Sequence, residues 1–226
     1  MGTSYNPRIV TDGLVFCVDA ANKRSYPGAG TTWTDLTANK NNGTLTNMDS
    51  SNFSNDGAGS LTFDGTDERV SIGTAPNTVI NNTGKTTILS WFYATAEGQG
   101  MILGNGTTAG RFYIETFGTG GSFVIHYGFG SSQNSTTSNA ALVTNRWYHY
   151  AASYDGSTAN GYLNSILVDS DSIGAQSFAG GINLSYWNAS LPLHFTGNIA
   201  LVQIYNRALT PDEIRQNYLA TKGRFQ

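Results

Sequence analysis

The stretch FTGNIALVQIYNRALTPDEIRQNY, residues 195–218, decides the fold. Its first half, Gly197–Tyr205, is rich in apolar and β-branched residues and has the length of a β-strand. Its second half begins a helix. Thr210 can cap the first turn, Pro211 fits the first helical position, and Glu213 stands three residues after Thr210 to complete a capping box. The sequence therefore predicts a strand followed by a short helix near the C-terminal end of the chain.

The helix is expected to span Pro211–Lys222, and Gly223 is placed to end it in a left-handed conformation. Leu209 and Ile214 flank the cap at the spacing of a hydrophobic staple. These two residues and Tyr218 are expected to hold the helix against the rest of the domain. Three polar residues of the helix are expected to face water: Asp212, Arg215 and Gln216.

Upstream of this stretch, apolar and polar residues alternate with a period of two almost everywhere, which predicts strands. Asp-Gly and Asn-Gly dipeptides between the runs supply the positive backbone angles of tight turns. A single sheet of so many strands would leave one apolar face in water, so two packed antiparallel sheets are expected, in an all-β fold with one C-terminal helix. The expected strands are Leu14–Asp19, Ser60–Phe63, Arg69–Ile72, Thr86–Tyr93, Met101–Leu103, Arg111–Thr116, Ser122–Tyr127, Trp147–Tyr154, Gly161–Val168, Ile182–Trp187 and Gly197–Tyr205.

The composition excludes several classes of protein. The chain has 226 residues, 12 basic and 15 acidic, and a net charge of -3, with no basic patch of the kind that binds nucleic acid. It has no apolar run of the roughly 20 residues that cross a bilayer, so membrane insertion is not expected. Its first ten residues lack the pattern of a secretory signal. Cys17 is the only cysteine and is expected to be a small buried residue.

The chain is expected to form a single domain over residues 13–226, preceded by an N-terminal arm over residues 1–12. The arm has no apolar pattern, and such segments are often ordered only by a partner. Two polar segments, Thr37–Gly59 and Gly130–Asn139, are expected to be loops, the second of them the loop of a hairpin.

Residues for catalysis are not apparent in the sequence. Glycoside hydrolysis needs two carboxylates on either side of the sugar bond, but the four Glu residues, 68, 97, 115 and 213, are scattered. His126, His149 and His194 stand apart from acidic neighbours, and no Gly-x-Ser-x-Gly motif is present. We expect His149 to be a hydrogen-bonded structural histidine. The sequence thus predicts that the protein is not an enzyme.

Asp64, Asp67 and Glu68 form the densest acidic cluster of the chain, in the stretch FDGTDERV. Two interpretations are open. Carboxylates of this kind hold Ca²⁺ together with backbone carbonyls, which makes Asp64 and Asp67 the candidate metal ligands. The alternative is a hairpin in which Asp64-Gly65 forms the turn.

Trp187 and Asn188, in SYWNAS near a turn, are the candidate glycan-binding residues. An exposed tryptophan offers a stacking surface, and an adjacent asparagine offers hydrogen bonds. The alternative for Trp187, as for the other three tryptophans, is packing in the core.

Three stretches resemble, in order, signature stretches of laminin-G-like domains in the concanavalin A-like lectin and glucanase superfamily: SLTFDGTDERVSI, NRWYHYAASYDGSTANGYLNS and FTGNIALVQIYNRALTPDEIRQNY. The resemblance covers residues 13–218 and implies a jelly-roll sandwich with one concave sheet. The chain departs from the family at Ala200 and Leu201, where many members have an acidic pair. That departure weakens a family-type calcium site. The acidic triad of the glucanase branch is absent.

A narrower resemblance concerns both ends of the chain. GLVFCVDAANKRSYPGAGTTWTDLTANKNNGTLTN and IRQNYLATKGRF look like stand-alone virion proteins of tailed bacteriophages, cyanophages in particular. The resemblance implies a non-enzymatic capsid decoration protein, head fibre or tail-fibre module, located in the virion and assembled in the host cytoplasm. Other capsid or tail proteins and further copies of the chain are its implied partners. The alternative function is a calcium-assisted carbohydrate-binding module for host surface polysaccharide.

Overall fold

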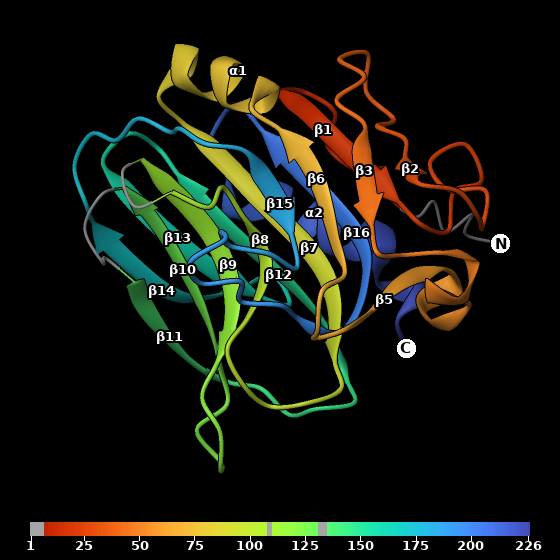
Figure 1. Ribbon diagram of the computed structural model, residues 1–226. Coiled ribbons are helices and arrows are strands. Elements are labelled where there is room, and N and C mark those ends of the chain that lie inside the picture. The colour runs from red at the N-terminus through yellow and green to blue at the C-terminus, as the bar shows by residue number, and fades with distance from the viewer. Residues whose placement is uncertain (1–6, 108–109, 131–134) are drawn as a thin grey trace, which may run out of the picture.

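The computed structural model describes residues 7–107, 110–130 and 135–226. Within these ranges two antiparallel sheets pack face to face, as Figure 1 shows. Helix α1 (Ala75–Thr83) lies across one end of the sandwich, and helix α2 (Pro211–Thr221) packs against the outer face of one sheet. The predicted all-β sandwich with a short C-terminal helix is therefore confirmed. No helix in the described ranges has the length and apolarity needed to span a bilayer.

Sheet A, against which α2 packs, has the strand order β14-β13-β12-β7-β16-β5-β4, with β1 also paired to β16. Its strands are β1 (Leu14–Asp19), β4 (Phe53–Ser54), β5 (Ser60–Asp64), β7 (Thr86–Ala94), β12 (Trp147–Tyr154), β13 (Thr158–Leu163), β14 (Ile166–Ser172) and β16 (Thr196–Tyr205).

Sheet B has the strand order β11-β10-β9-β8-β15-β6-β3-β2. Its strands are β2 (Thr32–Trp33), β3 (Gly43–Thr46), β6 (Arg69–Gly73), β8 (Gly100–Gly104), β9 (Arg111–Phe117), β10 (Val124–Gly130), β11 (Ser135–Ala141) and β15 (Ile182–Leu184). Three short 3-10 turns complete the described secondary structure: Ser50–Asn52, Asp56–Ala58 and Lys222–Arg224.

Strand β16, predicted from the sequence, is the centre of sheet A. It pairs with β7 along one edge and with β5 and β1 along the other. A register shift between Ile199 and Leu201 turns its side chains so that Ile199, Val202 and Ile204 face the core between the sheets. Ala200 and Leu201 face the α2 side instead. Both faces of this strand are therefore buried.

The helix begins as the sequence predicts. Oγ1 of Thr210 accepts a hydrogen bond from the Glu213 backbone N–H, and the Glu213 carboxylate accepts one from the Thr210 backbone N–H. The Arg207 guanidinium donates two hydrogen bonds to the same carboxylate, at 2.7 and 2.8 Å, and these lower the pKa of Glu213 to about 2. Leu209 and Ile214 are buried against sheet A. The cap and the hydrophobic staple are both present.

The end of the helix differs from the prediction. The helix ends at Thr221, and Gly223 lies in the 3-10 turn Lys222–Arg224 without a positive φ. The turn continues the helical path so that Phe225 can stack on Trp91, with 4.1 Å between ring centroids. Packing of the next residues, rather than a glycine cap, decides where the helix stops.

Part of the expected N-terminal arm packs against the domain itself. The backbone N–H of Val10 donates to Asn217 Oδ1 at 2.8 Å, and its carbonyl accepts from the Tyr205 hydroxyl at 2.8 Å. The Arg8 carbonyl accepts from the Gln216 amide, and Asp12 pairs with Arg207. Residues 1–6 lie outside the described ranges.

The structure differs from the prediction for one expected strand and one expected loop. The run Gly161–Val168 is not one strand, because Asn164 and Ser165 adopt positive φ and form the turn between β13 and β14. The segment Gly130–Asn139 is not only a loop, because β11 begins at Ser135 and pairs with β10.

Three short elements, β3, β4 and α1, were not predicted from the sequence pattern. The expected loop Thr37–Gly59 contains β3 and β4, strands of four and two residues that are too short to show a period. Helix α1 is held by tertiary contacts: Ile80 is buried, Asn77 donates to the Gly180 carbonyl, and Asn81 donates to the Phe178 carbonyl.

His149 lies on the outer face of sheet A, wholly buried between Trp91 and Tyr218. It is structural, as predicted, but it is not hydrogen-bonded: neither ring nitrogen has a partner within the described part of the chain. Burial without a partner disfavours the charged ring and lowers the pKa of His149 to about 3. Cys17 is also buried, as predicted, and burial raises its pKa to about 12.

The low pKa of His149 predicts acid sensitivity. The unfolded chain takes up a proton near the ordinary histidine pKa of 6.5, whereas the folded chain resists it down to about pH 3. The free energy of unfolding should therefore fall as pH drops through this window, by at most about 5 kcal/mol. His149→Phe keeps an aromatic ring and removes the buried nitrogens, so it should reduce this loss, measured by urea unfolding at pH 7, 5 and 4. His194→Phe, at a half-buried histidine, is the control. Equal pH dependence in wild type and His149→Phe would contradict the assignment.

Candidate functional site

The outer face of sheet B carries a row of side chains from β9. Because successive residues of a strand point to opposite faces, Phe112 and Ile114 enter the core, while Arg111, Tyr113, Glu115 and Phe117 point outward. Strand β10 adds His126, which pairs with Glu115 in the antiparallel register. No helix covers this row in the described structure (Figure 1).

Two glycines allow aromatic rings to lie close against the sheet. Gly128 pairs with Tyr113, and a Cβ at Gly128 would lie 2.5 Å from the Tyr113 ring. A Cβ at Gly104 would lie 3.2 Å from the Trp187 ring. The Tyr113 and Trp187 rings meet edge to face, with 5.8 Å between centroids. Strand glycines here make room for side chains rather than for a turn.

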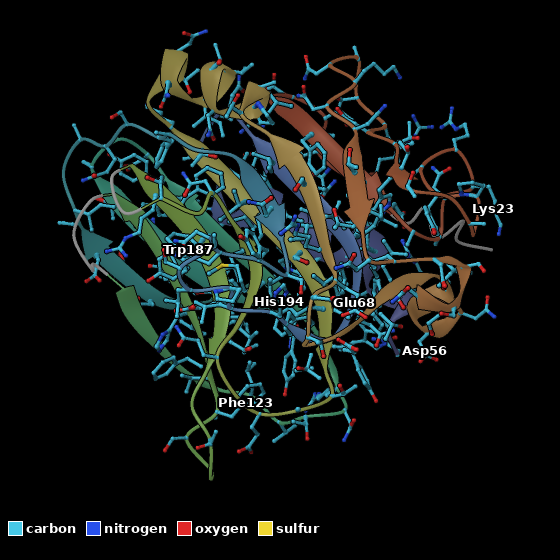
Figure 2. The ribbon with its side chains drawn as sticks, viewed as in Figure 1. Lys23, Asp56, Glu68, Phe123, Trp187 and His194 are labelled. Carbon is cyan, nitrogen blue, oxygen red and sulfur yellow. The ribbon has the colours of Figure 1, made fainter. Side chains whose placement is uncertain are left out.

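The segment between β15 and β16 forms one wall of the site and carries Trp187, which Figure 2 shows over sheet B. Asn188 holds this segment in place. Its side-chain amide donates to the Gly106 carbonyl, and its Oδ1 accepts from the backbone N–H groups of Ser190 and Leu191. The backbone N–H of Met101 in β8 donates to the Leu193 carbonyl at 2.9 Å.

The outer face of sheet B and the β15–β16 segment together form a pocket of about 320 Å³ that is open to solvent. Its size and its mixture of aromatic and polar walls are typical of ligand sites. We call it the sheet B pocket. Its lining residues are Gln99, Met101, Arg111, Tyr113, Glu115, Phe117, His126, Trp187, Leu191 and Leu193.

Glu115 and His126 form the polar end of the pocket. Glu115 is buried; its Oε2 accepts a hydrogen bond from the Gln99 amide at 3.1 Å, and its Oε1 lies 3.7 Å from His126 Nδ1. Phe117 stacks on the His126 ring at 4.7 Å and is 42% exposed. His126 Nε2 is buried and has no hydrogen-bond partner among the described residues. This end of the pocket offers an acceptor carboxylate and a solvent-facing aromatic surface.

Arg111 lies at the other end of the row. Its Nε donates to the Gly130 carbonyl at 3.2 Å, and its guanidinium carbon lies 6.0 Å from the centroid of the Tyr113 ring. The hydrogen bond and the ring contact hold the guanidinium beside the pocket.

Among the described lining residues, Glu115 is the single carboxylate. Cleavage of a glycosidic bond by the usual route needs two carboxylates about 5 to 10 Å apart across the bond. The pocket therefore offers binding groups without the acid pair of a glycosidase.

The two predicted glycan-binding residues, Trp187 and Asn188, differ in their position relative to the pocket. Trp187 is 7% exposed and packs on Met101 and Tyr113, yet it also lines the pocket, so it belongs to both a small apolar cluster and the site. Asn188 positions the wall and is not a lining residue. Sequence reasoning missed Glu115, His126 and Arg111. The alternation Arg-Phe-Tyr-Ile-Glu-Thr-Phe over residues 111–117 was the available signal, but it does not say which strands lie beside it.

The predicted calcium ligands lie elsewhere, at the turn that follows β5. Asp64 and Asp67 are exposed and Glu68 is buried. Asp64 Oδ1 accepts from the Thr66 backbone N–H at 2.7 Å, so the chain does turn here. The expected hairpin is wrong, however, because β5 belongs to sheet A and β6 to sheet B, and this turn carries the chain from one sheet to the other. The His194 ring lies beside this turn, with Nδ1 3.3 Å from the Glu68 carbonyl oxygen (Figure 2).

Asp64 and Glu68 interact with each other. A hydrogen bond between their carboxyl groups lowers the pKa of Asp64, whereas burial and the same bond raise the pKa of Glu68. Within the described residues no three His, Cys, Asp or Glu side chains come together in a way that could hold a metal ion. Calcium at Asp64 and Asp67 needs backbone carbonyls or water as further ligands, and it stays a prediction.

Comparisons with known proteins agree with this architecture. A model of the concanavalin A-like lectin/glucanases superfamily matches residues 64–215. No curated protein matches the chain. Domain 4 of AbnA, an extracellular GH43 arabinanase from Geobacillus stearothermophilus in complex with arabinotriose, has a similar structure, with a TM-score of 0.65 and 18% identity. The match covers 92% of this chain and 98% of that domain.

A sialidase from Trypanosoma rangeli in complex with sialic acid is also similar, with a TM-score of 0.72 and 14% identity over 98% of this chain. This chain spans only 36% of that sialidase chain. At these identities the similarities show a shared fold.

The calcium prediction has a direct test. A calcium ion at Asp64 must compete with protons for the carboxylate oxygens, so its binding weakens as pH falls. Calcium is therefore expected to raise the Tm of the wild-type protein at pH 7 and to raise it less at pH 5. The Tm of Asp64→Asn should be the same with and without calcium. Differential scanning calorimetry in excess calcium and in chelator measures this. An equal Tm in calcium and in chelator at pH 7 rules the site out.

Proposed function

The chain belongs to the concanavalin A-like lectin/glucanases superfamily, and we propose that it is a non-catalytic carbohydrate-binding domain whose site is the sheet B pocket. The observation that carries this proposal is the composition of the pocket. Aromatic rings of Tyr113, Phe117 and Trp187 line it together with the hydrogen-bonding groups of Gln99 and Glu115.

Sugars have apolar C–H faces and a rim of hydroxyl groups, and the pocket is suited to both. Phe117 presents 42% of its surface to solvent and can take an apolar sugar face. The Glu115 carboxylate can accept hydrogen bonds from sugar hydroxyls, and the Gln99 side-chain amide beside it adds a further polar group. A few placed polar groups within apolar walls are the usual composition of a small-molecule site.

The structural neighbours support a binding role by analogy. Domain 4 of AbnA, which matches nearly its whole length to this chain, was solved in complex with arabinotriose. Fold similarity alone does not transfer function, so the residues of this pocket are the stronger support for a binding role. The single carboxylate among the described lining residues favours binding over hydrolysis.

Display of this domain on a tailed-phage particle is a further part of the proposal, supported by the resemblance of the two ends of the sequence to virion proteins. A virion location gives the pocket a role in contact with host surface polysaccharide. Capsid or tail proteins and further copies of the chain are the proposed partners.

Removal of the exposed aromatic surface should weaken glycan binding. Phe117→Ala is expected to lower affinity about tenfold or more, equivalent to about 1.4 kcal/mol, for any glycan that binds on a glycan array. Trp187→Phe should weaken binding as well, because the smaller ring leaves part of the wall empty. Biolayer interferometry with the strongest array ligand measures both effects.

Leu167→Ala is the matched control, since Leu167 on β14 is an apolar side chain with 52% exposure outside the pocket. It should bind as wild type does. The proposal fails if no glycan binds the wild-type protein, or if Phe117→Ala binds as tightly as Leu167→Ala at an unchanged Tm.

The virion location predicts that purified phage particles contain the protein in many copies. Quantitative mass spectrometry of gradient-purified virions measures its copy number against the major capsid protein. Absence of the protein from such particles would end this part of the proposal without affecting the glycan site.

A further inference from the structure

We propose that Arg111 makes the sheet B pocket selective for acidic sugars, by binding a sugar carboxylate. This inference rests on the proposed glycan-binding function and names its ligand class. The feature that points to it is a positive charge at one end of the pocket that no acidic side chain of the protein neutralises.

Arg111 differs in this respect from two other partly buried arginines. Arg207 pairs with Asp12 and Glu213, and Arg224 pairs with Asp19 at 2.8 Å. Within the described residues no carboxylate lies within 4.0 Å of Arg111, and the hydrogen bond from its side chain to the Gly130 carbonyl uses Nε. A guanidinium has five N–H donors, so the described residues leave most of its donor capacity for water or a ligand.

The residues outside the described ranges supply no carboxylate for Arg111 either. Thr108 and Ala109 precede Arg111, and residues 131–134, Ser-Ser-Gln-Asn, follow the Gly130 carbonyl that Arg111 contacts. None of these has a carboxyl group, and none of residues 1–6 has one either. The sequence therefore excludes an acidic side chain there as the missing partner.

The acid of the pocket is too far away to neutralise Arg111 or to repel its ligand strongly. Arg111 and Glu115 stand four residues apart on one strand face, which separates their Cα atoms by about 13 Å. Glu115 is already engaged by Gln99 and lies next to His126. At such a distance, and with solvent in the open pocket, their charges are largely screened from each other.

The position of Arg111 suits recognition of a sugar carboxylate. Its Nε is fixed by the Gly130 carbonyl, and Tyr113 lies next to its guanidinium. A planar guanidinium binds a carboxylate through two parallel hydrogen bonds, which lysine cannot reproduce. Between Arg111 and Glu115 the pocket is lined by Tyr113 and Trp187. A sugar carboxylate at Arg111 would therefore place the sugar ring over the aromatic part of the pocket.

The experiment compares acidic oligosaccharides with their carboxyl-reduced counterparts on one glycan array and then by isothermal titration calorimetry. Wild-type protein is expected to bind the acidic form at least tenfold more tightly, and the preference should shrink as salt rises. Arg111→Gln should bring the affinity ratio of the two forms close to one. Arg111→Lys should retain only part of the preference, because it keeps the charge and loses the planar fork.

Arg215→Gln is the matched control, because it removes the same charge from an exposed position on α2. It should keep the full preference, and the Tm of each variant reports on folding. Equal affinity of wild-type protein for the acidic and reduced forms, or an unchanged ratio in Arg111→Gln, overturns the inference while glycan binding itself stands. Absence of binding to every glycan overturns the proposed function and this inference together.

Discussion

The structure depends on the burial of β16 on both of its faces. This strand exchanges backbone hydrogen bonds with β7, β5 and β1, so it joins segments from the beginning, the middle and the end of the chain. Ile199, Val202 and Ile204 fill the core between the sheets, while Ala200 and Leu201 pack on the opposite side, towards α2. A strand between two dry layers must satisfy its backbone polar groups within the sheet, and this requirement fixes its neighbours and their register.

The two outer faces of the sandwich are consequently different. The outer face of sheet A is covered by α2, by residues that include Val10, and by Phe225, and it holds a histidine so dehydrated that its pKa falls to about 3. The outer face of sheet B carries Arg111, Glu115 and His126 around an open pocket. Burial of apolar surface holds α2 and its neighbours against sheet A, whereas charged and aromatic groups stay accessible on the outer face of sheet B. A ligand site is therefore expected on sheet B.

Particular residues show how far local pattern reaches. Thr210, Pro211 and Glu213 were sufficient to predict the start of α2, because a capping box is a contact among residues three apart. Gly223 was a misleading signal, since the 3-10 turn Lys222–Arg224 continues the helical path and lets Phe225 stack on Trp91. The α1 helix was missed because contacts with residues far along the chain hold it in place. The β13–β14 turn was missed because the positive φ values of Asn164 and Ser165 do not show in the strand pattern.

The sequence by itself determined the class of the fold, most strand positions and the helix start, because these follow from local periodicity and capping chemistry. The pocket was decided only by the tertiary structure. Glu115 and His126 are eleven positions apart in the chain, and Trp187 follows after a further sixty-one, yet all three line one hollow. Strand pairing and the packing of the β15–β16 segment bring them together, and neither is encoded in the spacing of the residues along the chain.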